Sequence, residues 1–138
     1  MRTRSPGRLE PLIFFLDANL GKRAIAEALR QAGAEVQIHD DHFRQGTNDV
    51  EWLPEVGLRK WIVLTKDTQL RYHTPERIAL MQSGVRAFVL TAGNLSAREM
   101  ADIFVQALPA IRRFVADHQP PFIAKVNRSG AVSMIINK

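Results

Sequence analysis

Residues 12–16 read Leu-Ile-Phe-Phe-Leu, an apolar run with no polar interruption, and Asp17 follows it directly. Such a run is typical of a strand covered on both faces, because a strand with one wet face alternates apolar and polar residues. The run is too short for the core of a signal peptide, which needs roughly 7–15 apolar residues, or for a membrane helix, which needs about 20. We therefore expect a buried strand here, and a cytoplasmic protein that has no membrane partner.

Short apolar strands alternate with helical patterns along the rest of the chain. Further strands are predicted at residues 35–39, 61–65 and 85–90. Helices are predicted at residues 20–32, 50–61 and 74–82, and again after Ser96, which forms a capping-box pattern with Glu99. Pro54 lies inside the second of these helices, which should either kink or begin its regular part near Leu53. The alternation of strands and helices favours a parallel sheet with helices on both faces.

The C-terminal region has a different pattern. Residues 122–127 and 131–137 flank Arg128-Ser129-Gly130, which predicts a terminal hairpin. The expected fold class is therefore α/β, with three layers (α/β/α), a central mostly parallel sheet and a C-terminal β-hairpin. The length suits a single domain of residues 1–138, in which residues 1–10 are the best candidate for a loose end.

The composition narrows the chemistry that is available. The 138 residues include no cysteine, and 19 basic against 14 acidic side chains give a net charge of +5. The lack of cysteine excludes a disulfide scaffold, a cysteine-ligated zinc site and a cysteine nucleophile. The basic excess is compatible with a polyanionic partner and equally with an ordinary positive surface.

Acidic side chains follow each of the first three predicted strands. Asp17 follows the first, Asp40 and Asp41 follow the second, and Asp67 follows the third, while Asp49 opens a helix near the same edge. Parallel strands end at one edge of a sheet, so these loops should meet there. Clustered carboxylates repel one another, and a divalent cation among them, magnesium or manganese, reduces that cost. Such a metal can activate water for attack on a phosphodiester.

Each of these residues also has a purely structural explanation. Asn19 could cap the following helix, and Asp67 could begin a turn. Asn48 and Glu51 resemble a capping box, in which case the acids at this helix start would serve its dipole. His42 could shuttle protons or be a polar loop residue. A dinucleotide site is disfavoured, because no Gly-x-Gly-x-x-Gly motif follows the first strand.

Four segments, taken in order, resemble the PIN-like domain family. They read FLDANL at residues 15–20, ALRQAG at 28–33, GTND at 46–49 and VLTKD at 63–67. The most similar group is the compact PIN-like toxins of bacterial toxin–antitoxin pairs. Motifs carry the resemblance over residues 14–90, and only the helical pattern extends it beyond Ser96.

This resemblance implies a magnesium- or manganese-dependent endoribonuclease with an RNA substrate, a cognate antitoxin as partner, and a possible homodimer. Asp17, Asp49 and Asp67 match the family's catalytic and metal-binding acids, and Asn19 and Thr65 would support them. The fourth acid of many PIN domains is absent from residues 91–94, and Asp41 or its neighbour Asp40 is the candidate replacement at the metal. The alternative is a catalytically weak or inactive module that binds RNA or a protein.

Basic residues near the expected edge are candidates for RNA binding. They are Lys22, Arg23, Lys66 and Arg71, with Arg44 nearby. Phosphate contacts by such residues would make RNA binding fall steeply with salt. The alternative is a set of scattered, solvated surface charges.

Overall fold

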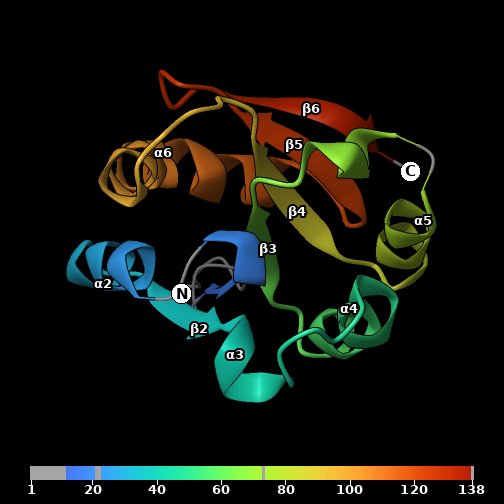
Figure 1. The fold of residues 1–138 in the computed structure, drawn as a ribbon. Helices are drawn as coiled ribbons and strands as arrows, with labels where there is room; N and C mark the ends of the chain where they lie inside the picture. The colour runs from blue at the N-terminus through green and yellow to red at the C-terminus, as the bar shows by residue number, and fades with distance from the viewer. Residues whose placement is uncertain (1–11, 21–22, 73, 138) are drawn as a thin grey trace, which may run out of the picture.

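A computed structural model describes residues 12–20, 23–72 and 74–137 of the chain; the predicted loose end, residues 1–10, lies outside them. Its centre is a six-stranded sheet with the strand order β2-β1-β3-β4-β5-β6 (Figure 1). The strands are β1 (Ile13–Leu16), β2 (Glu35–Ile38), β3 (Ile62–Thr65), β4 (Arg86–Leu90), β5 (Phe122–Val126) and β6 (Val132–Asn137). The first five are parallel and β6 is antiparallel to β5, which confirms the mostly parallel sheet and the terminal hairpin.

Helices cover both faces of this sheet. The α-helices are α2 (Ala24–Gln31), α3 (His39–His42), α4 (Asp49–Leu58), α5 (Pro75–Gln82) and α6 (Ala97–Asp117), and two 3-10 turns are η1 (Ala18–Leu20) and η2 (Thr68–Arg71). Figure 1 shows α2 and α6 on one side of the sheet and α4 and α5 on the other. The predicted three-layer arrangement is confirmed. None of the helices in the described part of the chain has the length and hydropathy that a membrane crossing requires.

The apolar residues of β1 contribute to two hydrophobic cores, one on each face of the sheet. Phe14 and Leu16 pack with the residues of α2 and α6, whereas Phe15 packs with those of α4. All three side chains are fully buried. Successive side chains of a strand point to opposite faces, so a strand between two helical layers has no position for a polar residue.

Three local predictions need correction. The helix expected at residues 20–32 is divided into η1, which contains Leu20, and α2, which begins at Ala24. His39 begins α3 instead of ending β2, because its ring packs inward against Phe15 and Trp52. The helix α4 begins at Asp49, before Leu53, and continues through Pro54. The proline removes only one backbone hydrogen bond of the helix.

The predicted helix starts of α5 and α6 are confirmed. Thr74 caps α5 by accepting a hydrogen bond from the backbone N–H of Arg77 at 3.1 Å, and Pro75 occupies the first helical position. Ser96 and Glu99 form the complete capping box of α6, with bonds of 2.8 and 3.1 Å.

The helices α4 and α5 approach each other closely at their C-terminal ends. A side-chain carbon built on Gly57 of α4 would collide with the backbone carbonyl of Ser83, the residue that ends α5. Only glycine allows this backbone approach. Both helices begin at the opposite edge of the sheet, where Asp49 opens α4 and Glu76 lies in the first turn of α5.

Candidate active site at the carboxyl edge of the sheet

Asp17 is held at the carboxyl end of β1 by its backbone and its burial. Its N–H donates a hydrogen bond of 3.0 Å to the carbonyl of Leu64 in β3, the neighbouring strand. The residue is only 8% exposed. Its Oδ1 accepts a bond of 2.6 Å from the N–H of Ala18. A buried carboxylate is costly unless it is hydrogen-bonded, and these bonds reduce that cost.

The hydroxyl of Thr65, the last residue of β3, connects the two strand ends. It donates to Oδ2 of Asp17 at 2.9 Å and accepts from the backbone N–H of Asp67 at 3.1 Å. Asn19 lies beside it, with Oδ1 3.3 Å from the hydroxyl and 3.4 Å from the N–H of Lys66, so its side chain joins the strand ends instead of capping a helix. Thr65 is fully buried. The two predicted supporting residues therefore lie between Asp17 and Asp67.

Asp49 is oriented by a tryptophan that sequence reasoning missed. The indole Nε1–H of Trp52 donates to Oδ1 of Asp49 at 3.0 Å, and Trp52 itself is buried against the sheet. The capping box expected from Asn48 and Glu51 is not formed, since the Asn48 side chain makes no cap bond. The available signal was the spacing of three residues, which places Asp49 and Trp52 on one face of the helix.

The pKa values show that the carboxylates act on one another. Burial raises the pKa of Asp17, and the charge of Asp67 adds to the rise, while the Thr65 hydrogen bond and the charge of His39 oppose it. Burial, followed by the charge of Asp17, raises the pKa of Asp49 to about 6, with smaller contributions from Asp67 and Glu76. Asp17, Asp49, Asp67 and Glu76 therefore form one electrostatic unit, which we name the acidic group.

Glu76 is the member of the acidic group that sequence reasoning did not single out. In the sequence it belongs to a helix start, Thr74-Pro75-Glu76, and a first-turn acid has an ordinary role there. The same topological argument that selected Asp49 applies to it, because a helix that follows a parallel strand begins at the carboxyl edge of the sheet. The acid at this helix start, Glu76, is therefore expected at the same edge as Asp49.

Asp67 and Asp41, two further predicted ligands, differ in placement. Asp67 caps η2, accepting from the N–H of Gln69 at 3.0 Å, so its turn role and its place in the acidic group coexist. Asp41 is exposed on α3. It is not among the residues whose charges have the largest effects on the pKa of Asp17 or Asp49. In the described ranges, no three histidine or acidic side chains converge closely enough, as arranged, to hold a metal ion.

The two histidines of α3 have different surroundings. His39 is buried, with Nδ1 3.2 Å from Oδ1 of Asp40 and its ring against Phe15 and Trp52. His42 is exposed, and its Nε2 lies 2.7 Å from Oε1 of Gln37. His39 lies close enough for its charge to act on Asp17, whereas His42 belongs to the outer surface.

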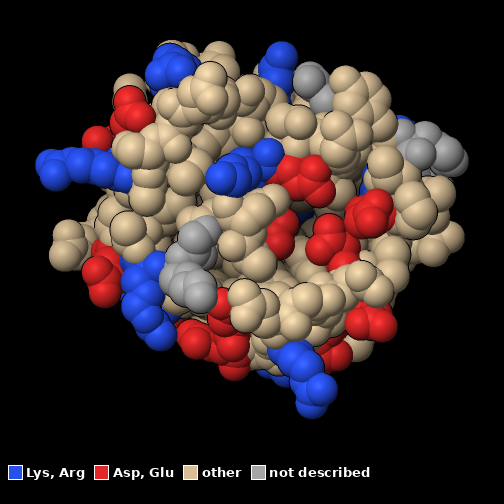
Figure 2. Space-filling view, viewed as in Figure 1, with Lys and Arg blue, Asp and Glu red and all other residues tan. Residues whose placement is uncertain are grey.

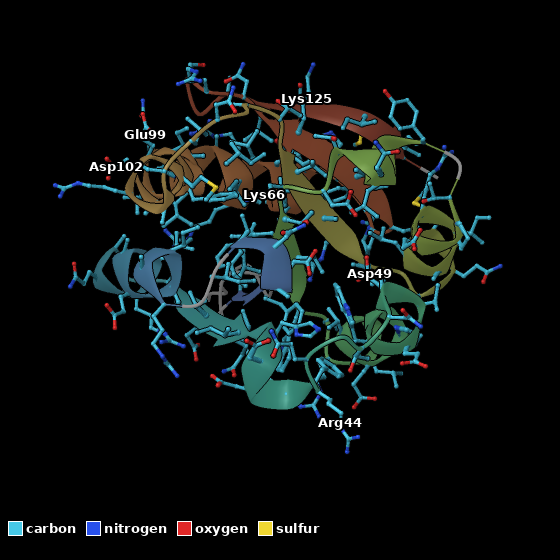
Figure 3. The ribbon with its side chains drawn as sticks, in the orientation of Figure 1. Arg44, Asp49, Lys66, Glu99, Asp102 and Lys125 are labelled. Atoms are coloured by element: carbon cyan, nitrogen blue, oxygen red, sulfur yellow. The ribbon has the colours of Figure 1, made fainter. Side chains whose placement is uncertain are left out.

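The predicted RNA-binding residues are only partly described. Lys66 is exposed at the carboxyl edge, and Figure 3 places it near the centre of the face with Asp49 to one side. Arg23 is exposed at the start of α2; Lys22 and the side chain of Arg71 lie outside the described residues. Arg44 projects beyond α3 and α4, away from Lys66 (Figure 3). In Figure 2, acidic side chains gather around a depression in this face, with basic side chains beside it and around the rim.

Comparisons with known proteins show the family of the chain. A family described as "PIN like domain" matches residues 12–92. VapC45 of Mycobacterium tuberculosis (strain ATCC 25618 / H37Rv), which is named as a candidate ribonuclease, is 28% identical over 125 residues, or 88% of this chain and 90% of that protein. No solved structure matches the chain. The family match takes in the whole acidic group and more than half of the sequence, and the chain belongs to the PIN-like domain family.

Proposed function

We propose that this protein is a metal-dependent endoribonuclease that hydrolyses RNA phosphodiester bonds, and that it is the toxin of a type II toxin–antitoxin pair. The acidic group carries the proposal, because burial and then the charge of Asp17 raise the pKa of Asp49 to about 6, and Asp67 and Glu76 add to the rise. Family membership and the likeness to VapC45 support the ribonuclease activity and the antitoxin partner. We infer from the proposed RNA substrate and antitoxin that the protein acts in the cytoplasm.

The donor set of the acidic group fits magnesium or manganese. Its ligands are carboxylate oxygens, which hard divalent cations prefer, and a cation would remove the mutual repulsion that the pKa values record. Asp17, Asp49 and Asp67 would hold the ion, and Glu76 lies beside them as a fourth acid. Asp41 stays a prediction from the sequence. The bound metal would polarise the phosphate and supply an activated water.

The protein's own residues perform the positioning. Thr65 holds Asp17 and the loop of Asp67, and Trp52 holds Asp49, so hydrogen bonds keep all three residues at the carboxyl edge. Their carboxylates would still have to move together to bind one ion. Lys66, next in sequence to Asp67, provides a positive charge for the phosphate chain beside the acidic group. A homodimer remains a further proposal from the family resemblance.

Metal removal tests this proposal. We expect the protein to cleave single-stranded RNA in magnesium or manganese, to stop in excess EDTA, and to resume when either metal is restored. Isothermal titration calorimetry should show heat of binding with millimolar metal. Cleavage that continues in EDTA would contradict metal dependence. The absence of both cleavage and metal binding, with RNA binding that persists in EDTA, would instead identify a binding module that has lost catalysis.

A further inference from the structure

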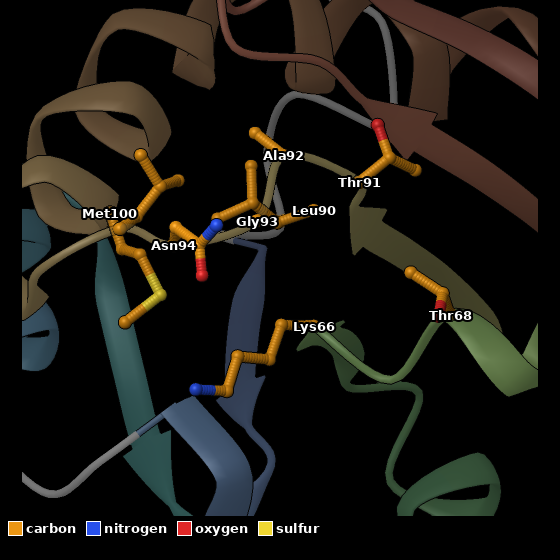
Figure 4. A pocket seen from close by; sticks show the side chains of 9 residues that line it. Lys66, Thr68, Leu90, Thr91, Ala92, Gly93, Asn94 and Met100 are labelled. Atoms are coloured by element: carbon orange, nitrogen blue, oxygen red, sulfur yellow. The ribbon is translucent and has the colours of Figure 1, made fainter.

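A hollow of about 430 Å³ lies at the same edge of the sheet, on the side of Lys66 that faces α6 (Figure 4). Lys66 and Thr68 form one wall, and the loop of residues 90–95 with Met100 forms the other. We name it the Lys66 hollow. Its volume is within the range of small-molecule sites, which is roughly 300–1,000 Å³.

The Lys66 hollow has free polar groups beside two buried apolar residues. Leu90 and Met100 are buried, and both line it. Figure 4 shows Asn94 and Met100 facing the side chain of Lys66 across the space. Within the described ranges, neither the ammonium group of Lys66 nor the amide of Asn94 has a hydrogen-bond or ion-pair partner. A cation beside an amide matches a phosphate and the polar edge of a base.

The loop that carries Asn94 is held by its backbone. The N–H of Thr91 donates to the carbonyl of Val126 at 3.0 Å, and Nη2 of Arg128 lies 3.4 Å from the carbonyl of Gly93. Asn94 itself has a φ of 58°, a left-handed conformation that asparagine tolerates better than most residues. The backbone therefore presents the amide at a fixed place, although the side chain has no partner of its own.

The hollow adjoins the acidic group through consecutive residues. Thr65 binds Asp17, Lys66 lines the hollow, and Asp67 belongs to the acidic group. A polynucleotide whose phosphate is bound at the acidic group would thus have its neighbouring nucleotide beside the hollow. We propose that the Lys66 hollow binds the nucleotide next to the scissile phosphate, with Lys66 on its phosphate and Asn94 at the edge of its base. This inference rests on the proposed RNA substrate and names its specificity-determining residue.

Binding without cleavage provides the test. Fluorescence anisotropy in EDTA would follow the full chain with labelled pentaribonucleotides of A, C or U. We expect Lys66→Gln to weaken all three complexes about fivefold. It should also lower the slope of log affinity against log salt by about 0.7, the share of one phosphate contact on a single strand. We expect Asn94→Gly to leave that slope unchanged and to reduce the preference among the three sequences by about tenfold.

Lys60 provides matched controls for both variants. It is exposed, precedes β3 at the opposite edge of the sheet, and has a φ of 60°, close to that of Asn94. Lys60→Gln therefore repeats the loss of a lysine charge, and Lys60→Gly repeats the change to glycine in a left-handed conformation. We expect both controls to bind as wild type.

The outcomes separate this inference from the nuclease itself. If Lys66→Gln and Asn94→Gly both keep the wild-type RNA affinity, salt dependence and sequence preference, the inference is wrong, even if the protein cleaves RNA. The expected losses in a protein that never cleaves would uphold the hollow while the nuclease proposal failed. A wild-type protein that binds none of the pentaribonucleotides would also overturn it, and the hollow would then fit a side chain of a protein partner.

Discussion

The acidic group and the Lys66 hollow share one edge of the sheet but differ in how their polar side chains are held. In the acidic group, Asp17, Asp49 and Asp67 each accept a hydrogen bond from the protein. In the Lys66 hollow, Lys66 and Asn94 have no such partner within the described residues. Fixed carboxylates suit a small, invariant ligand such as a cation, whereas free polar ends suit a ligand that varies in sequence. The difference predicts a division between catalysis and RNA binding.

The largest expected effect tests that division directly. Asp17→Asn should reduce RNA cleavage in magnesium by at least about a hundredfold, because it removes a charge from the proposed metal site. The same variant should bind pentaribonucleotides in EDTA at least as well as wild type. Asp102→Asn, an exposed change on α6, is the control and should cleave normally. Equal loss of cleavage and binding in Asp17→Asn would contradict the division, as would full activity.

Thr65 should have a smaller, indirect effect on catalysis. Thr65→Val keeps the shape of the side chain but removes the bonds to Asp17 and Asp67, which should cost about 1–2 kcal/mol of unfolding free energy. Cleavage should fall about tenfold, because the carboxylates lose their orientation.

Thr65→Ser is the matched control for this positioning role. It retains both hydrogen bonds and loses one methyl group, which costs about 1 kcal/mol in a buried site. Denaturation should thus show two variants of similar stability, and only the valine variant should lose cleavage. If the serine variant loses as much activity, packing and not the hydroxyl is responsible.

The smallest effect concerns stability and pH in the absence of metal. Asp49 has a folded-state pKa of about 6 against an ordinary value of 3.8, so the folded protein binds more protons between these values. Its contribution to stability is complete below about pH 4 and is lost as the pH rises through about 6. Because asparagine does not ionise, Asp49→Asn should not lose this stability as the pH rises. Its free energy of unfolding at about pH 7.5 should exceed that of the wild-type protein by about 1 kcal/mol after allowing for solvent screening.

Thermal unfolding in EDTA at several pH values measures this effect. Added magnesium should then raise the melting temperature of the wild-type protein and have less effect on Asp49→Asn. A decline in stability with pH that is as large in Asp49→Asn as in the wild-type protein would show that Asp49 does not cause it, and would remove this support for the acidic group.

Elements with strong local signals could be predicted from the sequence. The apolar run of residues 12–16 predicts a strand buried on both faces, and its end places Asp17 at the carboxyl edge. The cap residues Thr74 and Ser96 define the starts of α5 and α6 to the residue. Topology alone then brings Asp49 and Asp67 toward Asp17, because parallel strands end at one edge.

What the sequence could not provide depends on tertiary packing. The one-turn helix α3 turns His39 inward onto the ring of Phe15 and leaves Asp41 exposed, and a four-residue segment has no periodicity from which to predict this. The bond from Trp52 to Asp49 competes with an equally plausible capping box at Asn48. Glu76 was hidden by its ordinary role at a helix start.

The contact between Gly57 and Ser83 has a consequence at a distance. Two acids of the acidic group, Asp49 and Glu76, open helices whose other ends meet at this contact. A helix moves largely as a rigid rod, so a side chain at position 57 would tilt α4 and α5 apart and change the separation of their first turns. The distance between Asp49 and Glu76 at one edge of the molecule therefore depends on the lack of a side chain at Gly57 at the other edge.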